Sequence, residues 1–223
     1  MTQALINPML QATETEIISL LIGMGQEVEI AVDQAIESLL NSDVRLVEGI
    51  LRREDVINQM EMNIDKAVFA ALENGRLSEV EIRSVAFILK INKDLERLGD
   101  LATNIAHKVK NIAGRRAINT ASSELQPLAI AVHHLCRQML RALARQDLML
   151  AKNVLVAAAS VDAYRDYVFR QLCERRDGLA AGDAATLLLA SRYLEQIADH
   201  ATALAENLVR FLSEKRGEKA LAS

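Results

Sequence analysis

The sequence contains no tryptophan, two prolines and nine glycines among 223 residues, and aromatic residues make up only 3% of it. Proline and glycine interrupt helices more strongly than any other residue, so their scarcity favours long, unbroken helices. Hydrophobic residues nevertheless reach 51%, and a chain of this length can bury a substantial core. The composition therefore predicts an all-α protein.

Charge and hydropathy exclude two further classes of protein. Lys and Arg number 26 against 30 Asp and Glu, which leaves a net charge of −4, whereas nucleic-acid-binding domains carry a basic excess. We therefore expect no nucleic-acid partner. No apolar run approaches the roughly 20 residues of a transmembrane helix, and the first residues lack the basic start of a signal peptide. These absences predict a cytoplasmic protein with no transmembrane segment.

Cysteine is also scarce. Cys136 and Cys173 lie far apart, form no CxxC motif, and each falls within a helical apolar pattern. A paired or metal-binding role would need closer or patterned spacing. We expect two free, buried thiols in a reducing compartment.

Capping and turn signals divide the chain into long helices. The combination of Ser78 and Glu81 forms a capping box, as does that of Thr13 and Glu16, and each predicts a helix start. The pair Asn74-Gly75 predicts a helix end. A polar stretch from 115 to 123 is the one linker, and the charged tail after residue 213 is expected to fray. The six expected helices span residues 13–41, 43–73, 78–114, 123–146, 147–176 and about 183–213.

The two halves of the chain repeat each other. Leu95-Glu96-Arg97-Leu98-Gly99-Asp100-Leu101-Ala102-Thr103 recurs 99 positions later as Leu194-Glu195-Gln196-Ile197-Ala198-Asp199-His200-Ala201-Thr202. The preceding helix matches at an offset of 104, with Asp43 on Asp147. Short turns make consecutive helices antiparallel neighbours. The sequence therefore predicts two tandem antiparallel three-helix bundles, residues 12–114 and 123–213, related by internal duplication.

Acid pairs recur on these helices at i and i+4, the spacing that puts two side chains on one helix face. Like charges so placed repel by a few tenths of a kcal/mol, which suggests a bound cation between them. If neighbouring helices pack antiparallel, four carboxylates can face one another in each bundle. Such a set of ligands suits Mg, Mn, Ca or Fe rather than a structural zinc ion. The candidate metal ligands are Glu61, Asp65, Glu96 and Asp100 in the first bundle and Asp162, Asp166, Glu195 and Asp199 in the second.

Two alternatives to metal binding stay open at this point. A quarter of the chain is charged, so the acids can form an ordinary solvated network with Lys93 and Arg97, in a purely structural helical scaffold. A carboxylate-metal phosphoesterase is the other alternative, since paired metals activate water. The sequence offers no positioned base and no phosphate-binding loop for it, and we expect no enzyme activity.

One further feature is common to the repeats and another separates them. Gly99 and its counterpart Ala198 both keep a small side chain between the acids, and we expect close helix packing there. The first helix carries an acidic stripe of Glu29, Asp33 and Glu37 where the fourth carries His133, Arg137 and Arg141. These stripes are either two solvated faces or a contact between protomers or with a partner helix.

The motif-bearing helices resemble those of the PhoU family of phosphate-uptake regulators. The resemblance covers about residues 12–212 and rests on the stretch from Ile82 to Asp100 with Ala102 and Asn104-Ile105-Ala106, on Arg192 to Asp199, and on Val161-Asp162-Ala163 with Val168-Phe169-Arg170. The chain departs from the family pattern at Asn58, usually Asp, and at Gln196 and Ala198, usually Arg and Gly.

The resemblance implies a function as well as a fold. It implies divalent or trivalent metal ions (Fe, Zn, Mg, Mn or Ca) at the eight acids named above, four to each site. It implies a cytoplasmic regulator, working at the inner membrane through the phosphate ABC transporter ATPase and a sensor histidine kinase, that represses the phosphate-starvation response. We also expect a homodimer.

Overall fold

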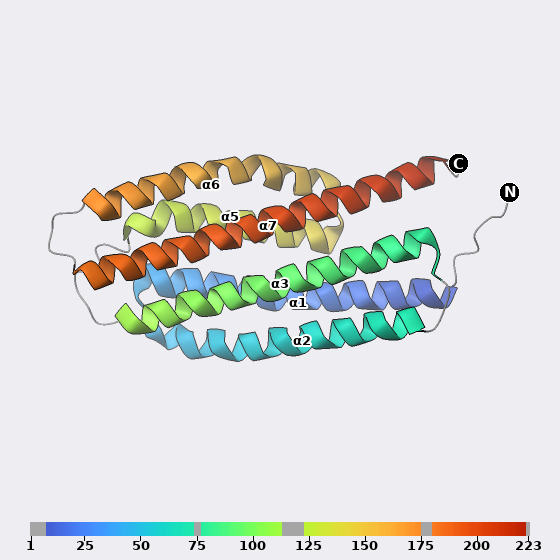
Figure 1. Cartoon of the computed structure of the whole chain (residues 1–223), viewed down its shortest axis with the longest axis horizontal. Helices are drawn as coiled ribbons and strands as arrows, with labels where there is room; N and C mark the ends of the chain where they lie inside the picture. The colour runs from blue at the N-terminus through green and yellow to red at the C-terminus, as the bar shows by residue number, and fades with distance from the viewer. Residues whose placement is uncertain (1–7, 74–76, 113–122, 175–179, 222–223) are drawn as a thin grey trace.

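The computed structural model describes residues 8–73, 77–112, 123–174 and 180–221, and within them the chain is helical throughout, apart from short turns (Figure 1). The α-helices are α1 (Pro8–Asn41), α2 (Val47–Glu73), α3 (Glu79–Ile112), α5 (Gln126–Arg145), α6 (Leu148–Glu174) and α7 (Ala181–Leu221), with the 3-10 turns η1 (Val44–Leu46) and η2 (Ser123–Leu125). The predicted all-α class is confirmed, with six α-helices in the described residues.

Two helices are longer than predicted. Helix α1 begins at Pro8 instead of Thr13, because proline is tolerated in a first turn and nothing after it interrupts the helix. Helix α7 continues to Leu221, so the prediction of a frayed tail after residue 213 was wrong. Glu, Lys, Arg, Ala and Leu dominate that tail and are strong helix formers.

Local signals set the other helix ends. Ser78 N donates to Glu81 Oε2 at 2.7 Å and Glu81 N donates to Ser78 Oγ at 3.4 Å, the reciprocal pair of a capping box. Asp147 Oδ1 accepts from the backbone N–H groups of Met149 and Leu150 and caps α6. The predicted end at Asn74-Gly75 and nearly all of the 115–123 linker lie outside the described residues.

The internal duplication appears in the burial pattern. At the offset of 104, the buried residues Ile57, Ile64 and Val68 of α2 fall on the buried residues Val161, Val168 and Leu172 of α6. At the offset of 99, Leu98 of α3 falls on Ile197 of α7, and both are fully buried. The same positions face inward in both repeats, so the sequence register is also the structural register.

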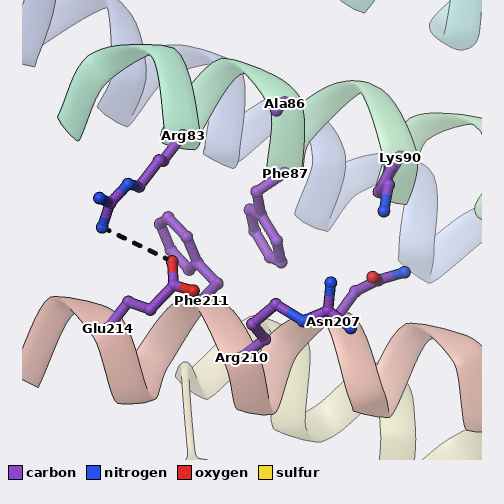
Figure 2. Close-up of a pocket in the computed structure, with 8 residues that line it drawn as sticks. All are labelled: Arg83, Ala86, Phe87, Lys90, Asn207, Arg210, Phe211 and Glu214. Atoms are coloured by element: carbon purple, nitrogen blue, oxygen red, sulfur yellow. Dashed lines mark ion pairs between the residues drawn. The ribbon is translucent and has the colours of Figure 1, made fainter. Parts of the chain in front are cut away.

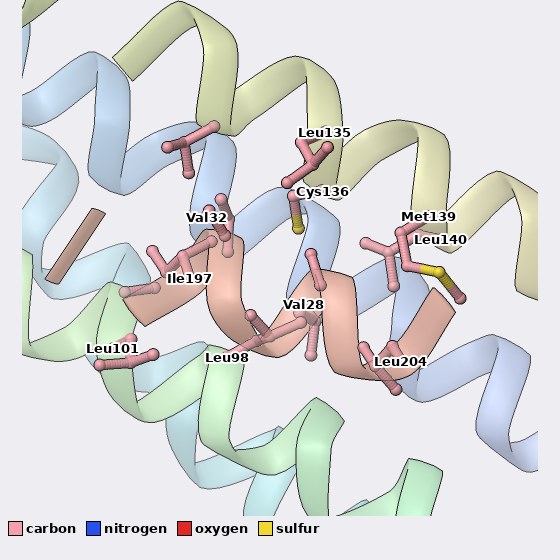
Figure 3. Packing of buried hydrophobic residues seen from close by; sticks show 14 of the residues in the cluster. Val28, Val32, Leu98, Leu101, Leu135, Cys136, Met139, Leu140, Ile197 and Leu204 are labelled. Carbon is pink, nitrogen blue, oxygen red and sulfur yellow. The ribbon is translucent and has the colours of Figure 1, made fainter. Parts of the chain in front are cut away.

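The two predicted bundles share one core. Helix α3 packs on α7 as well as on α1 and α2, and α5 packs on both α1 and α7. Figure 3 shows side chains of α1, α3, α5 and α7 interdigitating, among them Val28, Leu98, Met139 and Ile197. Helices α3 and α7 run antiparallel (Figure 1), and their buried hydrophobic side chains join the two repeats in one core.

The two cysteines have different surroundings. Cys136 is buried in this shared core, and burial, followed by the nearby carboxylates of Asp33 and Glu29, raises the pKa of its thiol to about 12. Cys173, near the end of α6, is exposed. The prediction of two free thiols is confirmed, but the prediction that both are buried was wrong for Cys173, whose position on α6 points away from the core.

The acidic and basic stripes meet within one chain. His133 Nε2 of α5 lies 2.9 Å from Asp33 Oδ1 of α1, and Arg137 Nε lies 2.9 Å from Glu29 Oε1. These two pairs are therefore neither solvated separately nor a contact between protomers, because α1 and α5 pack side by side across the repeat boundary. A third link, His200 Nδ1 to Asp94 Oδ1 at 3.2 Å, joins α7 to α3.

Among the residues that the structure describes, no helix combines the length and the apolar character needed to span a membrane.

Candidate metal sites on the acidic helix faces

The first acidic face lies between antiparallel α2 and α3. Lys93 Nζ lies 2.8 Å from Glu96 Oε2, one turn away on α3, and 3.5 Å from Glu61 Oε1 across on α2. Glu96 is only 15% exposed and Glu61 20%. Hydrogen bonding to Glu96 outweighs partial burial and raises the pKa of Lys93, so its ammonium group is held in the charged form.

The other two acids of this face have separate partners. Asp65 Oδ1 accepts a hydrogen bond of 2.9 Å from Asn92 Nδ2, which also donates to the backbone oxygen of Glu61. Asp100 Oδ2 lies 3.3 Å from Arg97 Nη1. In the described residues the buried Asn92 Oδ1 has no hydrogen-bond donor, so an amide oxygen beside Asp65 is available to a cation.

Gly99 brings the two helices close together between these acids. A Cβ atom built on Gly99 would stand 3.0 Å from Ile57 Cδ1 and 3.3 Å from its Cγ2. The predicted reason for a small residue here, close helix packing, is confirmed. Helices α2 and α3 thus form a narrow seam at Gly99. Lys93 precedes Gly99 on α3 and contacts Glu61 of α2, and Asp100 directly follows Gly99.

The second acidic face, between α6 and α7, is organised around Arg165. Its Nη1 lies 3.1 Å from Asp162 Oδ1 and 3.0 Å from Glu195 Oε1, and its Nη2 lies 3.0 Å from Asp166 Oδ1. Arg192 Nη1 adds a contact of 2.6 Å to Glu195 Oε2. Glu195 is 13% exposed, whereas Asp162 and Asp166 are 72% and 66% exposed. One guanidinium therefore contacts three of the four predicted ligands.

The electrostatics of Glu195 and Asp199 diverge. Burial alone would raise the pKa of Glu195, but hydrogen bonds from Arg192 and Arg165 outweigh it and lower the pKa. Burial raises the pKa of Asp199, and repulsion from Glu195 and Asp162 raises it further against a partial offset by Arg192. Position 196 holds Gln where the first repeat has Arg97, so Asp199 lacks the arginine neighbour of Asp100.

A groove lies beside Asp199 on the second acidic face. It has a volume of about 430 Å³, and Asp162, Glu195, Asp199 and Glu206 line it together with small apolar side chains such as Ala198. Three of the four predicted ligands of the second site therefore border one cavity, while Asp166 does not. Glu206 continues the acidic stripe along α7 toward the end of the groove.

The structure does not gather either set of four acids around a common point. In the described ranges, no three Asp, Glu, His or Cys side chains converge closely enough to hold a metal ion. The physical reason is visible in the contacts, because Lys93 in the first face and Arg165 in the second stand among the carboxylates. The eight-ligand assignment stays a prediction.

Sequence reasoning missed the role of Arg165 and of Asn92. At the offset of 104, Arg165 falls on Glu61 and Asp162 falls on Asn58, so the two faces do not draw their acids from equivalent positions. That substitution of Arg for Glu is the signal that could have identified Arg165. For Asn92, the signal was a polar residue at a buried position of the α3 pattern.

The ligand chemistry of both faces fits a hard cation. Carboxylate and amide oxygens are preferred by Mg²⁺, Ca²⁺ and Mn²⁺. Burial, together with repulsion from Glu195, raises the pKa of Asp199, and a cation bound beside it would favour its ionised form. A cation entering either face would compete with Lys93 or Arg165 for the same oxygens.

Both repeats match one known protein family. The family model described as the PhoU domain matches twice, at residues 21–109 and 128–208, which is once in each repeat. The chain belongs to the PhoU family. The family resemblance of the motif-bearing helices is therefore confirmed.

Individual PhoU proteins match over nearly the whole chain. A relative from Pseudomonas aeruginosa named "Phosphate-specific transport system accessory protein PhoU homolog" is 29% identical over 206 residues, 92% of this chain and 85% of the relative. The Serratia marcescens "Phosphate-specific transport system accessory protein PhoU" is 28% identical and is covered over 84% of its length. Both are named accessory proteins, and the expectation that this chain is not an enzyme agrees with its family.

Solved PhoU structures share the fold. The crystal structure of PhoU from Pseudomonas aeruginosa superposes with a TM-score of 0.84 at 28% identity and covers 92% of this chain and 99% of that one. PhoU from Streptococcus pneumoniae, at 21% identity and a TM-score of 0.80, supports the fold alone. The predicted all-α, duplicated PhoU-like architecture is confirmed.

Proposed function

We propose that this chain is a metal-binding regulatory adaptor of phosphate uptake and of phosphate-starvation signalling. The observation that carries the regulatory part is the double PhoU-domain match, with relatives named as accessory proteins of the phosphate-specific transport system along 92% of the chain. We propose that it acts with the ATPase of the phosphate ABC transporter and with a sensor histidine kinase, as a negative regulator. Its place would be the cytoplasm, peripheral to the inner membrane through these partners.

The metal-binding part rests on the carboxylates that α2/α3 and α6/α7 present to one another. Glu61, Asp65, Glu96 and Asp100 would hold one ion or cluster, and Asp162, Asp166, Glu195 and Asp199 the other. A bound cation would neutralise acids that otherwise depend on Lys93 and Arg165. It would tie the two helices of each face together, so metal loading would change the stiffness and charge of the surface offered to partners.

A homodimer is the third part of the proposal. The ion pairs of His133 with Asp33 and of Arg137 with Glu29 lie within one chain and give no support for a dimer, so the support comes from exposed apolar side chains of α6. Val156 is 78% exposed and Phe169 58% exposed, with Met149 at 61%. Sedimentation over a range of protein concentrations tests this part, and a constant monomer mass would contradict it.

Regulation is tested in cells that lack the chain. We expect a phosphate-starvation reporter to be active in phosphate-rich medium in these cells, and to be repressed again when the chain is supplied. Affinity purification from phosphate-replete and phosphate-starved cells would identify the transporter ATPase and the kinase as partners. A reporter that responds normally to phosphate without the chain would contradict the regulatory proposal.

Metal binding is tested separately by metal analysis of chelator-treated and reloaded protein. We compare the wild type with a double variant, Asp100→Asn plus Asp199→Asn, which removes one carboxylate from each face while preserving side-chain shape. The proposal expects metal in the wild type and much less in the variant. Equal and negligible metal in both would leave the scaffold alternative, with regulation through protein contacts alone.

A further inference from the structure

A pocket that the acidic faces do not include opens between α3 and α7, toward the N-terminal end of α3. It has a volume of about 170 Å³. Its lining residues are Arg83, Ala86, Phe87 and Lys90 of α3 and Asn207, Arg210, Phe211 and Glu214 of α7 (Figure 2). The pocket therefore lies where the two repeats meet, on helices that also carry the acidic motifs.

The lining carries a surplus of positive charge. Three cations, Arg83, Lys90 and Arg210, face one carboxylate, Glu214. Arg83 Nη1 lies 3.9 Å from Glu214 Oε2, and its Nη2 pairs with Glu79. In the described part of the chain, neither Lys90 nor Arg210 makes an ion pair, so two of the three cations keep their charge available.

The pocket has two distinct ends. The Arg83–Glu214 pair lies at one end of the Phe87 ring, and Lys90, Arg210 and Asn207 lie toward the other end, as Figure 2 shows. Lys90 extends from α3 toward α7, where Arg210 and Asn207 are one turn apart. An ammonium, a guanidinium and an amide group, all hydrogen-bond donors, thus border the same space, and none of them is paired with a carboxylate of the described residues.

A rigid aromatic pair fixes the spacing of the pocket walls. The rings of Phe87 and Phe211 stack with centroids 4.1 Å apart and an interplanar angle of 6°. Phe87 is buried, and Lys215 Nζ lies 5.3 Å from the centroid of the Phe211 ring, which adds a positive charge nearby. The stack holds α3 and α7 at a set distance, so the cations on the two helices need little rearrangement to act together.

The basic and aromatic cluster is particular to one end of the α3–α7 contact. At the offset of 99, the second repeat places Gly182, Thr186 and Leu189 at the positions of Arg83, Phe87 and Lys90. The other end keeps a cation, Lys108, at the position of Asn207, and its Nζ lies 5.9 Å from the centroid of the Tyr193 ring. The duplication therefore does not reproduce Arg83, Phe87 and Lys90, which points to a role for them beyond the packing that the two repeats share.

We propose that this pocket binds a phosphate group. Guanidinium and ammonium donors are the groups that proteins use for phosphate, which carries a charge of about −1.5 to −2 as a monoester at neutral pH. The volume of about 170 Å³ is below the roughly 300–1,000 Å³ of pockets that enclose drug-sized ligands. The pocket therefore suits inorganic phosphate or the phosphate of a small phosphorylated side chain. Binding follows from the pocket alone, and its use as a phosphate-responsive signal rests on the proposed regulatory function.

Equilibrium dialysis of the full chain at constant ionic strength tests the proposal, with radiolabelled inorganic phosphate and with phosphoserine as separate probes. We expect saturable binding of one or both. Phosphate binding would identify the free ion as the ligand, and binding of phosphoserine alone would identify a phosphorylated side chain. Absence of saturable binding of both probes would overturn the proposal.

Variants assign the binding to the pocket. Lys90→Gln plus Arg210→Gln should raise the dissociation constant at least tenfold. The fold should persist, because these two cations make no ion pair with the described residues that the substitutions would break. The matched control, Lys110→Gln plus Lys152→Gln, removes two exposed cations elsewhere and should bind like the wild type. If phosphate bound equally weakly to both double variants, the binding would be unspecific charge attraction, and the assignment to the pocket would be overturned. Unchanged binding in Lys90→Gln plus Arg210→Gln would overturn it as well.

The cell assay separates this inference from the proposed function. If phosphate binds but cells lacking the chain regulate normally, the pocket stands and the regulatory proposal fails. If neither probe binds while the chain still represses the starvation reporter, the pocket proposal fails and the regulatory one stands.

Discussion

Ile57 Cδ1 lies 3.0 Å from the position that a Cβ atom would occupy on Gly99. The equivalent pair in the second repeat is Val161 and Ala198, which are both buried. Valine lacks the Cδ1 atom that isoleucine has, and alanine has the Cβ atom that glycine lacks. Compared with the second repeat, the first repeat therefore has one more carbon at this position of its middle helix and one fewer at the facing position of its last helix. The total side-chain volume at the seam is conserved.

This compensation makes a prediction about coupled substitutions. Gly99→Ala brings a favourable helix-propensity contribution of about 1 kcal/mol, but it overpacks the seam, at a cost of about 1–3 kcal/mol. Ile57→Val alone costs about 0.5–1.5 kcal/mol through the cavity it leaves. Combined, the two substitutions reproduce the packing of the second repeat, so we expect Gly99→Ala to be at least about 1 kcal/mol more favourable in the Ile57→Val background.

Urea denaturation of the four proteins of this double-mutant cycle measures the coupling. Gly23→Ala serves as a control outside the seam, since its Cβ would meet the flexible end of Met60 at 3.3 Å and should not couple to Ile57. Additive free energies for Gly99 and Ile57 would show that the seam relaxes freely and that the two positions are independent.

The intrachain ion pairs between α1 and α5 make a second prediction. Arg137→Glu should lower the melting temperature at every protein concentration, because it places two carboxylates together where Arg137 Nε now lies 2.9 Å from Glu29 Oε1. Reversing both partners, Glu29→Arg with Arg137→Glu, should restore most of the loss. The pair is partly exposed, so the recoverable part is about 0.2–1 kcal/mol.

Differential scanning fluorimetry and sedimentation measure stability and mass side by side. Arg141→Glu is the matched control on the same helix, without a described carboxylate partner. If Arg137→Glu instead changed the mass of the particle and left the stability of the monomer unchanged, the contact would lie between protomers.

The features that were predictable from sequence are local or repeat with the chain. The capping box of Ser78 and Glu81 closes within one helical turn, so two residues three positions apart determine it. The small residue at Gly99 and Ala198 was recognisable because the duplication presents the position twice. Helix type and the repeat register follow from burial every three or four residues, which is a property of each helix alone.

What the sequence could not supply is the pairing across helices. Arg165 and Glu195 are 30 residues apart, and their contact depends on the relative position of α6 and α7 along their common axis. The acidic stripe of α1 could face solvent, a partner or α5, and only the packing of the two repeats decides among these. Helix ends also depend on contacts beyond the capping signal, as the continuation of α1 to Pro8 shows.

The raised pKa of Asp199 makes a third prediction, about pH. A carboxyl group whose pKa is above its usual 3.8 in the folded state disfavours folding once it ionises. Asp199→Asn should therefore raise the melting temperature at neutral pH. The gain should shrink as the pH falls through the raised pKa and should be lost below 3.8, where the wild-type carboxyl is protonated in both the folded and the unfolded state.

Thermal melts of the wild type and Asp199→Asn across this pH range test the sign. Asp100→Asn is the counterpart in the first repeat, and there we expect a small loss at neutral pH, because the contact of 3.3 Å with Arg97 disappears. A loss of stability in Asp199→Asn at neutral pH, or a gain that persists unchanged in acid, would contradict the electrostatic account.

Arg165 makes the last prediction, because its guanidinium contacts Asp162, Asp166 and Glu195. A metal ion at the second face must displace it. Arg165→Gln should therefore bind Mn²⁺ about three- to tenfold more tightly than the wild type, since each such exposed pair contributes about 0.2–1 kcal/mol and 1.4 kcal/mol is a factor of ten. Without metal, the same variant should melt at a lower temperature, because Asp162 and Asp166 lose their ion pairs and Glu195 keeps only its contact with Arg192.

Calorimetric titration with Mn²⁺ and melts with and without the ion give these two readouts independently. Lys152→Gln on the same helix controls for the loss of one positive charge and should change neither. Lys93→Gln makes the same test in the first face, where Lys93 bridges Glu61 and Glu96. If Arg165→Gln lost thermal stability but bound Mn²⁺ no better than the wild type, the guanidinium would be a permanent counter-ion, and the second face would hold α6 to α7 without metal.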